Sequence, residues 1–208
     1  LKNENGFLPL KGTDSLRIVE VSFGVEETNT LGNTLKNYAY VEHVGLAHDA
    51  KEADILKAFE KISESNIAVV QINKAGMKPE NNFGIGTQTF RLMDSIAKIK
   101  PTILVLNTSP YLLDKISEVS RYKAILVGYE YLPSLLRASA NAIMGVTKVN
   151  GKLPVSTKKF KAESGLQLEA VSAQNKNLMR ESFMKRKFGA VDSIALMGIQ
   201  EMAYPGCE

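Results

Sequence analysis

The sequence predicts an α/β fold: a doubly wound, mostly parallel sheet of five or six strands with helices on both faces. Short, almost uniformly apolar segments at 67–72 (IAVVQI), 102–106 (TILVL) and 124–127 (AILV) indicate strands that are buried on both sides. Amphipathic helical patterns separate these segments. Because parallel strands need long crossover connections, this alternation favours a sheet covered on both faces.

Two further strands come earlier in the chain. Residues 16–21 form the expected first strand, which ends in a turn at Gly24. Residues 40–46 alternate polar and apolar side chains, which is typical of a strand at a sheet edge. With right-handed crossovers, five strands in the flavodoxin-like order 2-1-3-4-5 place this second strand at the edge.

The helices follow from apolar residues at helical spacing. They are expected at residues 31–38, 53–62, 90–97 and 133–144. The third ends before Pro101, and the last ends at Gly145, a residue type common just after a helix. Ser109 and Pro110 fit the N-cap and first position of one more helix.

Composition excludes several classes of protein. The chain has 208 residues, of which 44% are hydrophobic, which is enough for one sizeable core. The chain has 26 Lys and Arg and 22 acidic residues, and the basic residues form one tight run, 185–187. Trp is absent. A nucleic-acid-binding surface is therefore not expected, because it needs clustered basic residues with aromatic side chains for stacking. No apolar run approaches the roughly 18 residues that a membrane span needs. A single cysteine, Cys207, excludes an internal disulfide.

The chain changes character after residue 156. Residues 158–177 are polar without a strong period, which indicates a connector, and 191–202 place apolar residues on one face of a short helix. We therefore expect an α/β domain at 1–156, and at 157–208 a linker and helix that lead to a truncated following domain. Because the sequence opens at Leu1 rather than Met, we expect it to be part of a longer protein.

Several ordered motifs resemble the C-terminal α/β domain of glycoside hydrolase family 3. NENGFLPLK (3–11) and GKLPVS (151–156) look like the boundaries of that domain. Between them, NTSPYLL (107–113), AILVGY (124–129) and ASANAIMG (138–145) are similar to segments of its two-domain β-N-acetylglucosaminidase branch. The resemblance covers about residues 1–156.

The resemblance implies a retaining glycosidase that hydrolyses terminal β-linked sugars. In this family an Asp on an N-terminal (β/α)8 barrel attacks the anomeric carbon, and retention needs a second group only about 5–5.5 Å away. That barrel would precede Leu1, so we assign no catalytic, cofactor-binding or metal-binding residue to this chain and no cofactor. The partner is the barrel of the same protein, and the family implies an exported or periplasmic location.

One carboxylate needs separate comparison with the family. In the β-glucosidase branch, the acid/base is a Glu on the loop after the third strand, near an E-G-x-D-R pattern. Here that region, 78–83, reads KPENNF without a following Asp-Arg pair, so Glu80 is a poor match. The departure favours the β-N-acetylglucosaminidase branch, where a barrel His is the acid/base, and we expect this chain to be catalytically silent.

The last residues carry a second resemblance. VDSI (191–194) through AYPG (203–206) look like the entry helix and turn of a serine β-lactamase-type domain. Ser-x-x-Lys is the nucleophile motif of such enzymes, but its repetition in a Lys-rich chain discriminates nothing. It occurs at Ser95/Lys98, Ser120/Lys123, Ser156/Lys159 and Ser182/Lys185.

Residues 28–34 (TNTLGNT) superficially resemble the FMN-phosphate loop of flavodoxins, T-x-T-G-N-T. Backbone amides at a helix N-terminus would bind the phosphate there. However, Leu31 breaks the spacing, and Glu26 and Glu27 would repel a phosphate dianion. A flavodoxin-like electron-transfer module therefore remains the alternative, together with an interaction module that has no hydrolase parent.

Three smaller patterns have ordinary explanations. Gly84-x-Gly86 lacks a third glycine and follows the third strand, so it is not a dinucleotide fingerprint. His43 and His48 are two imidazoles without further ligands, which do not make a metal site. The sequon at 107–109 lies at a strand end before Pro110, which favours a capping role over glycosylation.

Overall fold

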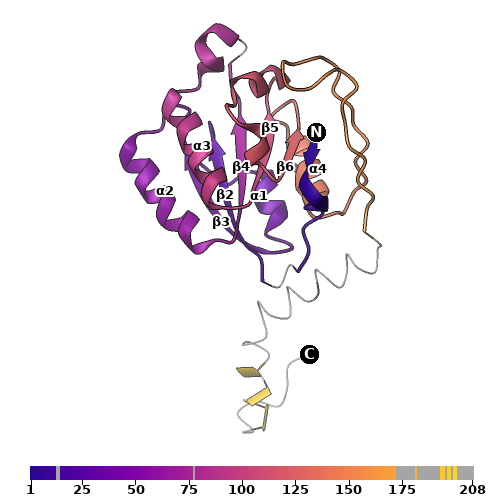
Figure 1. Cartoon of the computed structure of the whole chain (residues 1–208). Helices are drawn as coiled ribbons and strands as arrows, with labels where there is room; N and C mark the ends of the chain where they lie inside the picture. The colour runs from indigo at the N-terminus through magenta and orange to yellow at the C-terminus, as the bar shows by residue number, and fades with distance from the viewer. Residues whose placement is uncertain are drawn as a thin grey trace.

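The computed structural model describes residues 1–12, 15–76 and 78–171, together with 181, 193, 194, 196, 197, 199 and 200 (Figure 1). Six strands form one sheet in the order β1-β6-β5-β4-β2-β3. They are β1 (Lys2–Asn3), β2 (Arg17–Phe23), β3 (Tyr40–Leu46), β4 (Ile67–Asn73), β5 (Thr102–Asn107) and β6 (Ala124–Val127). The strands β2 to β6 pair in parallel, and numbered among themselves they have the predicted order 2-1-3-4-5, with β3 at the edge.

Strand β1 is the one strand whose position the sequence does not indicate. It pairs antiparallel with β6 at the opposite edge, with Lys2 beside Ile125 and Asn3 beside Ala124. Two residues are too few to display an alternating pattern, so the strand is recognised only from its pairing with β6 in the structure.

Four helices cover the two faces of the sheet (Figure 1). They are α1 (Thr30–Leu35), α2 (Glu52–Glu64), α3 (Thr87–Ile99) and α4 (Pro133–Ile143). One apolar core contains residues of α2 and α3, and the other contains residues of α1 and α4. The sheet is therefore doubly wound, as predicted, and its central strands β4 and β5 are buried throughout.

Local differences from the predicted elements are small. The first helix ends at Leu35 instead of residue 38. The expected helix at Pro110 is a 3₁₀ turn, Pro110–Lys115; Ser109 precedes it, but its side chain makes no capping hydrogen bond. Gly24 and Gly145 have φ values of 81° and 68°, which a side chain would disfavour, so both turn predictions are confirmed.

The segment after the last helix runs back along the domain. Val149 and Leu168 form an antiparallel bridge, and Val171 N–H donates to the Gly145 carbonyl at 2.8 Å. The boundary at residue 156 stays a prediction. Residues 193, 194, 196, 197, 199 and 200 are helical, whereas the rest of the predicted helix 191–202, the basic run 185–187 and Cys207 lie outside the described residues. No helix in the described residues is long and apolar enough to cross a membrane.

Candidate functional site

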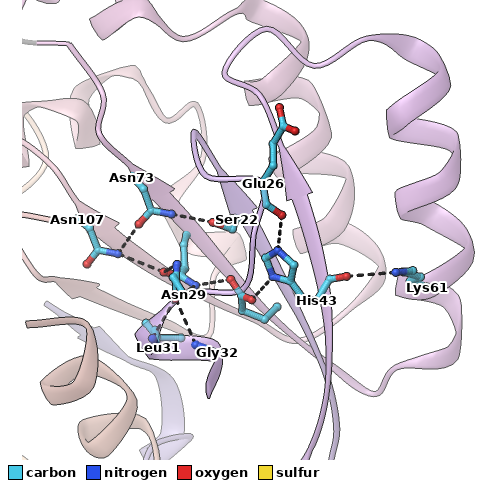
Figure 2. A network of polar contacts seen from close by, with 11 residues as sticks. Ser22, Glu26, Asn29, Leu31, Gly32, His43, Lys61, Asn73 and Asn107 are labelled. Atoms are coloured by element: carbon cyan, nitrogen blue, oxygen red, sulfur yellow. Dashed lines mark hydrogen bonds and ion pairs between the residues drawn. The ribbon is translucent and has the colours of Figure 1, made fainter. Parts of the chain in front are cut away.

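The carboxyl ends of β2 and β4 form the topological switch point of the sheet. The chain leaves β2 toward α1 on one face and leaves β4 toward α3 on the other, and α/β proteins with this topology have their ligand-binding crevice at this position. On the α1 and α4 face, neighbouring strands carry polar side chains near these ends (Figure 2). These side chains are Glu20, Ser22, His43, Gln71, Asn73 and Asn107.

Strand periodicity explains why these residues share a face. Side chains two apart along a strand point the same way, so Glu20 and Ser22 follow Ile18 on β2. In the same way Gln71 and Asn73 follow Val69 on β4. The apolar members belong to the core beneath α1 and α4, so each strand changes from apolar to polar as it reaches the crevice.

Glu20 is the centre of the polar network. It is fully buried, and its carboxylate contacts His43 Nδ1 through Oε2 and accepts a hydrogen bond from Gln71 Nε2 through Oε1. His43 Nε2 lies 2.7 Å from the Glu26 carbonyl oxygen. A carbonyl only accepts, so Nε2 carries a proton and His43 ties the loop after β2 to the sheet.

Gln71 extends the network to the start of α1. Its Oε1 accepts from Asn29 Nδ2 at 3.1 Å. Asn29 Oδ1 in turn accepts from the backbone N–H groups of Leu31 at 2.9 Å and Gly32 at 3.3 Å, which caps the helix. A side chain on Gly32 would come within 2.8 Å of a Glu20 carboxylate oxygen, so the helix start packs directly on the network.

Amides link the central strands. Asn73 Nδ2 donates to Ser22 Oγ at 2.9 Å, and Asn107 Nδ2 donates to Asn73 Oδ1 at 2.7 Å. Asn107 Oδ1 is buried without a hydrogen-bond partner in the described part of the chain, close to Gly128. Four parallel strands are therefore joined by side chains at the end of the sheet that carries the crevice.

Two residues form the outer rim of this site, and we call them the rim pair. Lys74 follows β4 directly and is exposed, and its Nζ lies 4.7 Å from the centre of the Tyr131 ring. Tyr131 packs against the core beneath α1 and α4. Burial, and then the negative charge of Glu20, raise the pKa of Tyr131, so the phenol keeps its proton at neutral pH.

The pKa of His43 is raised above its ordinary value of 6.5. Burial alone lowers it, but the hydrogen bond to Glu20 and the negative charge of Glu20 outweigh burial. A pKa that is higher in the folded than in the unfolded state adds stability that is complete below pH 6.5 and is lost as the pH rises through the folded value. We predict that the unfolding free energy falls as the pH rises from 6.5 through the folded pKa of His43, and that His43→Gln abolishes this fall.

Urea unfolding across pH 5–9, with the His43 pKa followed by NMR, measures both quantities. A folded pKa at or below 6.5 would contradict the assignment.

The comparisons with known proteins agree with this architecture. The sequence profile of the glycosyl hydrolase family 3 C-terminal domain matches residues 1–191. The chain belongs to this family. No curated protein matches it at a significant level.

Solved structures show the same fold. A family 3 β-N-acetylglucosaminidase from Paenibacillus sp. str. FPU-7 is 19% identical with a TM-score of 0.55, over 70% of this chain and 27% of that one. A mutant β-glucosidase from Listeria innocua in complex with laminaribiose is 15% identical with a TM-score of 0.57, over 73% and 24%. This chain therefore spans about a quarter of the length of these enzymes.

Within this family 3 domain, the FMN-phosphate interpretation of residues 28–34 is not favoured. The helix-start amides that a phosphate would need are occupied by the Asn29 side chain, and the buried Glu20 carboxylate lies beside Gly32. Both features oppose an anion at this position.

The family 3 domain keeps the two predicted histidines in separate places. His43 binds Glu20 and the Glu26 carbonyl, whereas the buried His48 ring nitrogens have no partner among the described residues and lie against Gly24. No group of three or more His, Cys, Asp or Glu side chains in the described parts of the chain could hold a metal ion.

The remaining motifs lie apart from the network. Glu80 is exposed in the 3₁₀ turn Pro79–Gly84, which also contains Gly84 of the glycine pair. The Ser95 and Ser120 hydroxyls donate to local acceptors, and Ser156 Oγ accepts from Ala162 N–H. The fourth Ser-x-x-Lys pair, at 182 and 185, lies outside the described residues.

Sequence reasoning missed most of the network, including Glu20, Gln71, Asn73 and the joint role of Asn107. A signal was present: polar residues lie at or near the ends of β2, β4 and β5, at positions on one face. The predicted capping role at 107–109 is wrong for the Asn107 side chain, which bonds to Asn73 instead, because neighbouring strands supply better partners than the next turn.

Proposed function

We propose that this chain is the non-catalytic C-terminal α/β domain of a family 3 glycoside hydrolase of the β-N-acetylglucosaminidase type. The parent enzyme hydrolyses terminal β-linked sugars on a (β/α)8 barrel that lies outside this chain. The domain packs against that barrel and holds the loops at the edge of its active site. The family match over residues 1–191 carries this proposal.

The polar network supports the scaffold role. It fixes the loop after β2 through the His43 contact with the Glu26 carbonyl, and it fixes the start of α1 through Asn29. Rigid loops are what an active site shared between domains needs, because small displacements of positioning groups cost catalytic rate. The departure from the E-G-x-D-R pattern at Glu80 supports the β-N-acetylglucosaminidase branch.

The gene sequence upstream of Leu1 tests the partner. We expect it to encode a barrel with an Asp nucleophile and a His-bearing loop. An upstream region without such a barrel would favour an interaction module with no hydrolase parent. A serine hydrolase-type domain after residue 208 remains a separate proposal, which the downstream sequence tests.

The catalytic assignment gives a kinetic prediction. In the full-length enzyme, Glu80→Gln is expected to leave kcat on a chromogenic N-acetylglucosaminide within about twofold, because a residue that transfers no proton can lose its charge without harm. Loss of a general acid would instead lower kcat by about 100-fold or more. Such a loss, or turnover by this chain alone that Glu80→Gln abolishes, would refute the silent-domain proposal.

A further inference from the structure

Two non-glycine residues with positive φ follow strands at the carboxyl end of the sheet. Lys74, directly after β4, has a φ of 51°, and Tyr129, two residues after β6, has a φ of 65°. Glu130 N–H donates to the Gly128 carbonyl at 2.7 Å, which makes Tyr129 the centre of a tight three-residue turn of the rarer, strained hand. Strained conformations of residues other than glycine persist where the surrounding structure enforces them, and they cluster at binding sites.

Lys74 has one of these conformations, and Tyr131 lies two residues after the other. Lys74 is exposed, and its ammonium has the Tyr131 ring as its partner in the described part of the chain. An ammonium has three N–H donors, and a ring face uses them only partly. The Tyr131 hydroxyl also has no hydrogen-bond partner among the described residues. The rim pair therefore presents unused hydrogen-bonding groups at the switch point.

The surrounding charge selects the class of ligand. Glu130 lies in the same loop as Tyr131, and Glu26 and Glu27 are exposed in the loop after β2. With three carboxylates and one ammonium on the loops that follow β2, β4 and β6, the local charge disfavours a phosphate or another multiply charged anion. A neutral, hydroxyl-rich ligand has no such repulsion, and hydroxyl groups accept from Lys and both accept from and donate to Tyr.

We propose that Lys74 and Tyr131 are a saccharide-contacting pair, which binds the hydroxyl groups of a sugar at the carboxyl edge of this sheet. The proposal takes its ligand class from the proposed function. It adds the residues through which a domain without catalytic groups of its own influences substrate affinity and specificity.

The test is a ¹⁵N NMR titration of this chain with N,N′-diacetylchitobiose, cellobiose and inorganic phosphate as separate probes. We expect a disaccharide to shift the amide signals of residues 73–75 and 129–132. Lys74→Met and Tyr131→Phe should each weaken the apparent affinity by about tenfold, as expected for loss of a hydrogen bond to or from the ligand.

The amino ends of the strands, opposite the switch point, supply a matched control. Arg17 and Tyr40, at the starts of β2 and β3, form a comparable cation–aromatic pair at 5.6 Å. Arg17→Met and Tyr40→Phe should leave the titration unchanged. All four side chains lie at least partly at the surface, so the variant spectra verify that the fold is kept.

Shifts confined to other residues, undiminished affinity in both rim variants, or no sugar-induced shift up to the solubility limit would overturn the proposal. Phosphate producing the same shifts as the sugars would overturn the neutral ligand class. The titration measures binding without turnover, so its failure is distinct from failure of the proposed function, which the upstream gene sequence decides.

Discussion

Glu20→Ala is expected to lower the unfolding free energy of the domain by about 3–5 kcal/mol, the usual cost of removing one partner of a buried charged pair. Glu20 is fully buried, and its carboxylate contacts both His43 and Gln71. Its removal leaves the Gln71 amide and the His43 imidazole without their partners and opens a cavity between β2 and α1. Urea unfolding followed by circular dichroism measures the loss.

Two variants separate charge from packing. Glu20→Gln keeps the volume and allows every hydrogen bond with a neutral His43, because the new amide can donate to Nδ1. It should cost less than Glu20→Ala and should abolish the pH dependence attributed to His43. Glu42→Ala removes a partly exposed carboxylate on the neighbouring strand β3, 3.9 Å from Lys61 of α2, and should cost less than about 1 kcal/mol. Equal losses for Glu20→Ala and Glu42→Ala would contradict a central role for Glu20.

The fold was predictable because its strongest signals are local. The buried strands at 67–72 and 124–127 are continuous apolar runs, and the structure places β4 and β6 there within one residue. The edge position of 40–46 followed from its polar alternation, which a strand covered on both faces would lack. Strand β1 was not predicted because its two residues carry no sequence pattern and are identified as a strand only by their pairing with β6.

The site was less predictable because it depends on register. Glu20 and His43 are 23 positions apart, and they meet because β2 and β3 pair with these two residues side by side. Gln71 reaches Glu20 from the other neighbouring strand, 51 positions away. The sequence predicts the order of the strands but not their exact register. A shift of one residue in the pairing would turn these side chains to the other face of the sheet.

Gly45→Ala is the second variant with a large expected effect. Gly45 lies on β3, and the loop after β2 crosses it so closely that an added Cβ would overlap the Glu26 carbonyl group. The obstacle is backbone, so relief requires the loop to move. The same carbonyl accepts the hydrogen bond from His43 Nε2, and displacement would break it. We expect a loss of about 3 kcal/mol in unfolding free energy, at the upper end for an overpacked site.

A matched glycine separates this steric effect from the general effect of replacing glycine. Gly151 has no atom within 4 Å of an added Cβ, so Gly151→Ala should change the unfolding free energy by less than about 1 kcal/mol. In Gly45→Ala, the His43 pKa should also fall toward its ordinary value, because the Glu26 carbonyl no longer favours the protonated ring. An unchanged His43 pKa together with an unchanged stability would mean that the loop after β2 is not held against β3. The domain would then lack the rigid edge on which the scaffold role depends.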